Sequence, residues 1–106
     1  MIIREWRCCA KQADAAKYPD YFRKEIIREL RAAPGFLGAI LCQRPSGEFM
    51  EFLIYSRWES MDAIRGFAGT NPDNAVIDTA AMALVATYDD KVRHYEVLED
   101  LSAKKA

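Results

Sequence analysis

The segment at residues 48–58 constrains the fold of this chain most, because it has no polar face. If the segment is a strand, its two alternating faces are both apolar, with Met50, Phe52, Ile54 and Trp58 on one and Phe49, Leu53 and Tyr55 on the other. Such a strand has to be covered on both faces. The chain therefore needs helices on one side of its sheet and a second covering layer on the other side.

The residues before this segment predict a strand, a helix and a second strand. Residues 2–10 favour a pleated surface, and Asp14 is positioned to cap a helix that has Pro19 in its first turn. Apolar side chains then recur every four residues along the predicted helix, at Tyr18, Phe22, Ile26 and Leu30. Pro34 and Gly35 end the helix, and residues 36–44 form the second strand. The turn at residues 45–47 makes this strand the hairpin partner of residues 48–58.

The residues after the hairpin predict a second helix and a closing strand. Ser60 caps a short helix that Gly69 ends, and residues 70–74 form a loop. Residues 75–88 are apolar and rich in Ala, which favours a further helix or helical turn packed on the sheet. Asp89 and Asp90 interrupt this segment, and residues 91–98 alternate as the last strand.

The order β-α-β-β-α-β predicts a ferredoxin-like α+β fold, in which a four-stranded antiparallel sheet carries its helices on one face. We expect one domain over residues 1–99 and a C-terminal tail over residues 100–106, with a frayed end. This topology places the third strand between the first two, so Cys42 is distant from Cys8 and Cys9. Because the helices leave one apolar sheet face bare, we expect a homodimer formed by sheet-to-sheet packing.

Charge and cysteine content exclude several classes of protein. Fifteen Lys and Arg residues oppose sixteen Asp and Glu residues, so no basic field is available for a nucleic acid partner. No apolar run reaches the roughly 18–20 residues of a membrane span, and the N-terminus is charged, so we expect a cytoplasmic protein with no membrane partner. We expect three reduced cysteines and no metal site; a redox pair of Cys8 and Cys9 is the disfavoured alternative.

Two stretches carry a resemblance to a known family. Residues 58–69 read W-x-S-x-x-A-I-x-x-F-A-G, and residues 93–97 read R-H-Y-E-V. With the N-terminal strand MIIREWR they resemble the antibiotic biosynthesis monooxygenase domain family, small dimeric α/β-barrel proteins, over residues 1–99. Some members of that family oxidise polyketide aromatics with molecular oxygen, and relatives degrade haem or isomerise lactones.

The resemblance implies a small cofactor-independent monooxygenase that acts on a quinol-like or anthrone-like aromatic molecule within a homodimer. The alternative from another class is a non-catalytic dimeric barrel protein that binds a small lipophilic ligand. Haem degradation is a third reading, disfavoured because the haem-degrading relatives carry an Asn on the first strand and a haem-ligating His in the second helix. This sequence has no Asn in residues 2–10, and its single His is His94.

No cofactor is expected, because the sequence lacks a glycine-rich phosphate loop and a zinc-binding pattern. The predicted site is an apolar pocket between the sheet and the helices with a few polar tips. His94 is the candidate general base, because its ordinary pKa suits proton transfer near neutral pH. The alternative is a structural His with both nitrogens hydrogen-bonded. Trp58 is the second candidate catalytic residue, as a donor to a developing oxyanion, with core packing as its alternative.

The candidate substrate-binding residues come from the first strand and from both helices. Trp6 could stack on a planar substrate, and Arg4 could hold a phenolate or carboxylate, although a cross-strand ion pair is the commoner use of such an Arg. Aromatic side chains on the helices could form the roof of the pocket or belong to the core, namely Tyr18, Tyr21 and Phe22 on the first helix and Phe67 on the second.

Overall fold

The structure is a computed structural model, and it describes residues 1–103 of the chain. Its strands are β1 (Ile2–Lys11), β2 (Phe36–Ser46), β3 (Phe49–Trp58), β4 (Thr87–Tyr88) and β5 (Arg93–Glu96). Its α-helices are α1 (Lys17–Tyr21), α2 (Ile27–Ala32), α3 (Met61–Ala68) and α4 (Thr79–Met82). A 3₁₀ turn at Gln12–Asp14 precedes α1, and a π-helical turn at Phe22–Ile26 joins α1 to α2. None of the described helices is long and apolar enough to span a membrane.

The sheet is antiparallel, and its strand order is β2-β3-β1-β4. β5 pairs with the same edge of β1 as a second short strand, at Ile2–Glu5, whereas β4 pairs with Cys8 and Cys9. Two short strands therefore divide the fourth position of the predicted ferredoxin-like sheet. The prediction that β3 lies between β1 and β2 is confirmed, and Cys8, Cys9 and Cys42 are free thiols.

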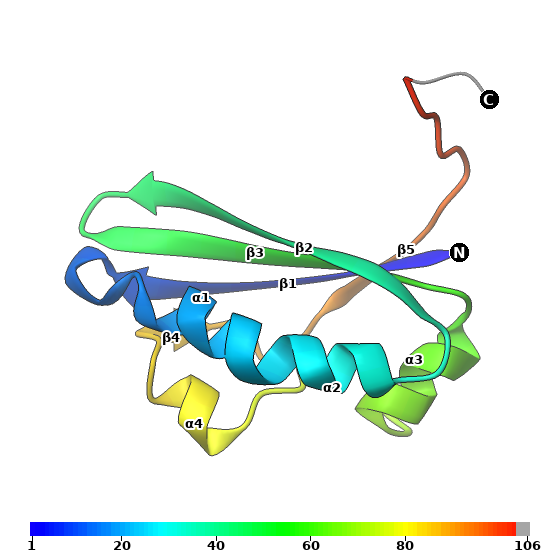
Figure 1. The fold of residues 1–106 in the computed structure, drawn as a ribbon, viewed down its shortest axis with the longest axis horizontal. Helices are drawn as coiled ribbons and strands as arrows, with labels where there is room; N and C mark the ends of the chain where they lie inside the picture. Colours follow the sequence, from blue (N-terminus) through cyan, green and yellow to red (C-terminus); the bar gives the residue numbers. More distant parts are fainter. Residues whose placement is uncertain (104–106) are drawn as a thin grey trace.

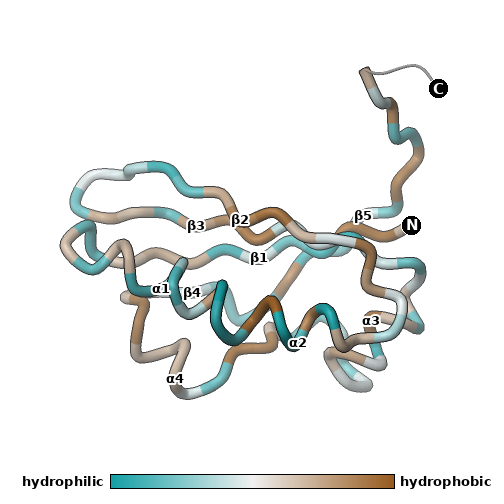
Figure 2. The backbone as a smooth tube through the Cα atoms, in the orientation of Figure 1, coloured by the Kyte–Doolittle hydropathy of each residue, from teal (hydrophilic) through white to brown (hydrophobic). Residues whose placement is uncertain are grey.

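The helices lie on one face of the sheet, as Figure 1 shows. Apolar stretches of α1 and α2 alternate with polar ones along the chain, which is how one side of a helix faces a core (Figure 2). On the covered face Phe52, Trp58 and Ile64 are fully buried. Complete burial of an apolar side chain of this size stabilises the fold by about 1.5–3 kcal/mol. The core thus lies between β1, β3 and the helices.

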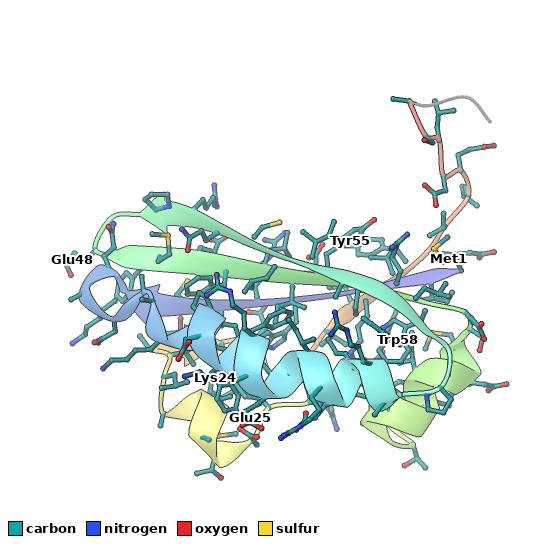
Figure 3. The ribbon with its side chains drawn as sticks, viewed as in Figure 1. Met1, Lys24, Glu25, Glu48, Tyr55 and Trp58 are labelled. Atoms are coloured by element: carbon teal, nitrogen blue, oxygen red, sulfur yellow. The ribbon has the colours of Figure 1, made fainter. Side chains whose placement is uncertain are left out.

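The opposite face of the sheet has no helix over it. Figure 3 shows Tyr55 on this face and Trp58 on the helix side of the same strand. Ile40 of β2 pairs with Tyr55 and is 55% exposed. The apolar third strand therefore presents one set of side chains to the core and the other to the uncovered face, which we call the open face.

One local expectation was wrong: Asp14 does not cap α1. It pairs with Lys17 at 3.0 Å, and no side chain caps this helix. Of the helix or helical turn expected in residues 75–88, only the turn forms, as α4, and β4 follows it, because Val, Ile and Thr favour extended backbone and override the Ala-rich pattern. The cap at Ser60 is confirmed, since its hydroxyl accepts from the Ala63 amide at 3.1 Å.

Candidate functional site

A cavity of about 270 Å³ lies between the sheet and the helices. Its floor is formed by β1 and β3, with Arg4, Trp6, Ile54 and Ser56. Its roof comes from the helices, with Tyr18, Tyr21, Ile26, Glu29, Leu30 and Phe67. Its outer wall comes from the segment at residues 72–92, which we call the outer segment, with Val76, Ile77, Asp78, Ala81 and Val92. Mostly apolar walls with a few polar side chains are typical of a small-molecule site.

Arg4 is the buried cation of this cavity, with 6% of its surface exposed. Its Nη1 donates to the carbonyl oxygen of Pro72 at 2.5 Å, and its Nη2 donates to that of Asn74 at 2.9 Å. Burial lowers the pKa of Arg4 to about 10, against the opposing effect of Asp73, so the guanidinium stays charged at neutral pH. Arg4 therefore brings a positive charge to the cavity floor and also ties down the start of the outer segment.

His94 lies behind Arg4, and its side chain is 11% exposed. Its Nε2 is 2.9 Å from Nη1 of Arg4, and its Nδ1 is 3.2 Å from Oδ1 of Asp73. Because Arg can only donate, we assign the proton of the neutral ring to Nδ1, from which it is donated to Asp73. Burial and then the Arg4 charge lower the pKa of His94, and Asp73 partly offsets them. Both ring nitrogens are thus engaged.

Tyr21 and Asp78 form the polar contact between the roof and the outer wall. The Tyr21 hydroxyl donates to Oδ2 of Asp78 at 2.6 Å, and Oδ1 accepts from the Ala81 amide at 2.8 Å at the start of α4. The hydrogen bond to Asp78 raises the pKa of Tyr21 to about 12. The same bond and then the Ala81 amide lower the pKa of Asp78, so Asp78 is a carboxylate at neutral pH.

The aromatic side chains divide between the cavity and the core. The Trp6 indole donates to the carbonyl oxygen of Asp89 at 2.7 Å, and its ring lies 6.1 Å from that of Tyr18. Trp58 is fully buried, and its indole donates to Oγ of Ser56 at 2.9 Å. Its ring lies 5.1 Å from Phe67. Trp58 thus lies behind two cavity residues, Ser56 and Phe67.

Five of the eight candidate site residues named from the sequence line the cavity: Arg4, Trp6, Tyr18, Tyr21 and Phe67. The other three, Phe22, Trp58 and His94, are not among its lining residues. Phe22 packs in the core cluster that contains Trp58.

Sequence reasoning missed Ser56 and Asp78. Ser56 was detectable as a hydroxyl residue within an apolar strand. Asp78 was detectable only as a helix cap, which carries no information about a cavity. Among the described residues, no group of three or more His, Cys, Asp and Glu side chains could hold a metal ion.

Comparison with known proteins gives one family match. The profile of the family described as "Antibiotic biosynthesis monooxygenase" matches residues 1–73. No curated protein matches the chain in sequence.

Several solved structures share the fold. A candidate antibiotic biosynthesis monooxygenase from Bacillus cereus has a TM-score of 0.71 and 17% identity over 99% of this chain and 98% of its own. A monooxygenase from Streptomyces coelicolor, in complex with the ligand nanaomycin D, has a TM-score of 0.57 and 18% identity over 99% and 92%. The haem degrader MhuD from Mycobacterium tuberculosis, with two haems bound in its active site, has a TM-score of 0.58 and 20% identity over 96% and 100%.

Proposed function

Because this chain belongs to the antibiotic biosynthesis monooxygenase family, we propose that it is a small-molecule monooxygenase whose substrate, an electron-rich aromatic of the quinol or anthrone kind, binds between the sheet and the helices. The observation that carries this proposal is the cavity of about 270 Å³, which joins apolar walls to the buried cation Arg4. Nanaomycin D, bound by the Streptomyces coelicolor neighbour, supports a small-molecule ligand.

The proposed reaction needs no external reductant. An anthrone methylene loses a proton, and the resulting carbanion or enolate gives its electrons to molecular oxygen. One oxygen atom becomes the new carbonyl group, and the other leaves as water with the two methylene hydrogens. The four-electron oxidation of the carbon balances the four-electron reduction of oxygen. The protein then supplies position, a base and a site sheltered from water.

Arg4 and His94 have distinct roles in this proposal. Arg4 stabilises the negative charge that develops on the substrate oxygen when the proton leaves. His94 is the proposed base, and because its Nε2 accepts from Arg4 in the free protein, substrate has to displace that N–H before His94 can take a proton. Trp58 is proposed to act through Ser56, whose hydroxyl it orients by donating to Oγ.

We also propose that the protein is a homodimer assembled through the open face. Exposed apolar residues support a covering layer there: Ile40 is 55% exposed and Tyr95 is 49% exposed. The chain after β5 rises on the side away from the helices (Figure 1), and its Leu98 and Leu101 are 84% and 94% exposed.

Equilibrium sedimentation at micromolar concentration should give the mass of the dimer. Leu53→Glu in β3 should shift the measured mass towards that of the monomer. A monomeric wild type would contradict this part of the proposal.

Binding without catalysis is the second candidate function. The observation that favours it is that both nitrogens of His94, the proposed base, are already hydrogen-bonded. A protein of this kind would take up the aromatic molecule without consuming oxygen.

Haem degradation fits this cavity poorly. The described residues that line it include no His, Cys or Met, which are common axial ligands of haem iron. Of its two tyrosines, Tyr21 donates its hydroxyl proton to Asp78, and burial raises the pKa of Tyr18, which disfavours the phenolate that would bind iron. We therefore expect no Soret shift when haem is titrated into the protein.

Oxygen uptake tests the proposal. With a panel of reduced anthrones and quinols, we expect one oxygen molecule consumed per anthrone, faster than spontaneous oxidation, and a large loss of rate in His94→Ala. Equal rates for the two proteins would remove the base assignment, and tight binding without oxygen uptake would favour the non-catalytic binder.

The free thiols, including Cys8, whose pKa burial raises to about 12, support a reducing cytoplasmic location.

A further inference from the structure

We propose that the Tyr21–Asp78 pair selects aromatic ligands that present a hydroxyl group as a hydrogen-bond donor. This inference deepens the proposed function, on which it rests, by naming a chemical requirement of the ligand. It starts from two side chains that come from opposite parts of the cavity wall, Tyr21 on the roof and Asp78 on the outer wall.

The direction of the hydrogen bond between these side chains is fixed. The Asp78 carboxylate can only accept, so Tyr21 must donate its single hydroxyl proton to Oδ2, at 2.6 Å. The lone pairs of the Tyr21 oxygen are then left to accept a hydrogen bond. A ligand that reaches this oxygen therefore finds an acceptor, backed by a negative charge.

The surrounding charges favour the same kind of ligand. Glu29 also lines the roof of the cavity, so the Tyr21 end carries two carboxylates, whereas the floor carries Arg4. A phenolate would be repelled by Asp78 and Glu29, whereas a neutral phenol can donate its proton to Tyr21. Tyr21 is half-buried and Asp78 is exposed, so a ligand can reach the pair. The geometry thus orients an aromatic with its hydroxyl group towards Tyr21 and its electron-rich carbonyl or second oxygen towards Arg4.

One substitution should reverse this selectivity. In Asp78→Asn the side-chain oxygen has to face the Ala81 amide, because that N–H needs an acceptor, and this leaves the NH₂ group facing Tyr21. The amide then donates to the Tyr21 oxygen, and the Tyr21 proton is released to point at the ligand. The same cavity should now prefer a ligand that can only accept a hydrogen bond. The helix cap survives, since Asn caps as well as Asp does.

The test compares 2-naphthol with 2-methoxynaphthalene, which differ in the hydroxyl proton. Calorimetric titration of each compound into the same protein preparation gives a ratio of dissociation constants that does not depend on the folded fraction. Tyr21→Phe, which lacks the hydroxyl, sets the baseline ratio. In the wild type we expect the ratio of the two dissociation constants to favour 2-naphthol about tenfold more than it does in Tyr21→Phe. In Asp78→Asn we expect the same ratio to favour 2-methoxynaphthalene more than it does in Tyr21→Phe. Asp62→Asn, a matched loss of charge on the exposed surface of α3, should keep the wild-type ratio.

Two results would overturn the inference alone: a wild-type ratio equal to that of Tyr21→Phe, or an Asp78→Asn ratio equal to that of the wild type. In both cases the naphthalenes still bind, and the proposed function survives. If neither compound bound to the wild type, the cavity would not be an aromatic site, and the proposed function would fail together with this inference.

Discussion

The two sides of the cavity are held in different ways. The inner side consists of β1, β3 and the helices, where every residue of Ile2–Lys11 pairs with β3 and the core includes the fully buried Phe52 and Trp58. The outer segment at residues 72–92 has one helical turn and the two-residue strand β4, and it is attached by that short pairing with β1, by the buried Ala81 and Val92 and by a few side-chain hydrogen bonds. Apolar periodicity therefore builds the inner side of this site, whereas a short strand pairing and a few hydrogen bonds position its outer wall.

The contacts of the outer segment are specific and widely spaced. Arg4 binds the carbonyl groups of Pro72 and Asn74, and the amide of Ala86 donates to the carbonyl oxygen of Cys9 at 2.7 Å. Individual hydrogen bonds contribute about 0.5–1.5 kcal/mol each, and those to charged groups about 1.5–3 kcal/mol. The outer segment should therefore open at a lower free energy than the inner side.

The largest expected effect comes from the inner side. Phe52→Ala removes a fully buried ring that packs beside Tyr18, with ring centroids 5.5 Å apart. We expect the free energy of unfolding to fall by about 4 kcal/mol, measured by denaturant titration, because the substitution leaves a cavity in the core. Leu37→Ala, at a half-exposed position of β2, should cost well under half as much. Amide exchange should accelerate throughout the chain. Acceleration confined to the outer segment would show that the inner side is not the more stable of the two.

Arg4→Met should have the next largest effect, with a loss of about 2–3 kcal/mol. The substitution removes the donors to Pro72, Asn74 and His94 while it keeps a long apolar side chain. Amide exchange should accelerate at residues 73–92 and stay close to wild type in β3. The control is Arg7→Met on the same strand, where the Arg pairs with Glu5 at a half-exposed site. Uniform acceleration along the chain would show that Arg4 supports the whole fold and not the outer wall.

The sequence predicted the inner side of the cavity better than the outer segment. The stripe on the first helix and the alternation in residues 48–58 predicted the inner side, because burial imposes a period on the sequence. The outer segment was predicted as a helix or helical turn, and only the turn exists. Its path depends on the hydrogen bonds from Arg4 to the backbone carbonyl oxygens of Pro72 and Asn74. Every residue type has a backbone carbonyl group, so the sequence of that segment does not indicate these contacts.

The candidate site shows the same limit. Arg4, Trp6, Tyr18 and Phe67 were predicted from their elements, and they line the cavity. Asp78 was missed because its hydrogen bond with Tyr21, 57 residues away in sequence, depends on the path of the outer segment.

A smaller effect is expected at the start of α4. Asp78→Ala removes both the helix cap and the partner of Tyr21, and we expect a loss of about 1 kcal/mol in the free energy of unfolding. Asp78→Asn keeps the cap and should cost less than half of that. Denaturant titration of the two variants measures the contribution of the cap; equal losses of stability would mean that the cap does not stabilise the outer wall.

The smallest effect concerns pH. Burial lowers the pKa of His94 below its ordinary value of 6.5, so below that pH the unfolded chain binds a proton more readily than the folded protein. The contribution of neutral His94 to the free energy of unfolding is therefore fully present above pH 6.5 and is lost as the pH falls below that value. Between about pH 7.5 and pH 5.5, the wild-type Tm should fall by about 2 °C more than that of His94→Gln. The reverse order would mean that Asp73 outweighs burial and Arg4.

The most direct test of the central claim, that the aromatic ligand binds between the two sides of the cavity, is a two-dimensional NMR titration with 2-naphthol. We expect the indole N–H signal of Trp6 and the amide signals of Ile77 and Asp78 to move together and to saturate at one ligand per chain. The amides of Cys42 and Leu53 on the open face should stay in place. Movement of the open-face signals with an unchanged Trp6 indole would show that the ligand binds elsewhere.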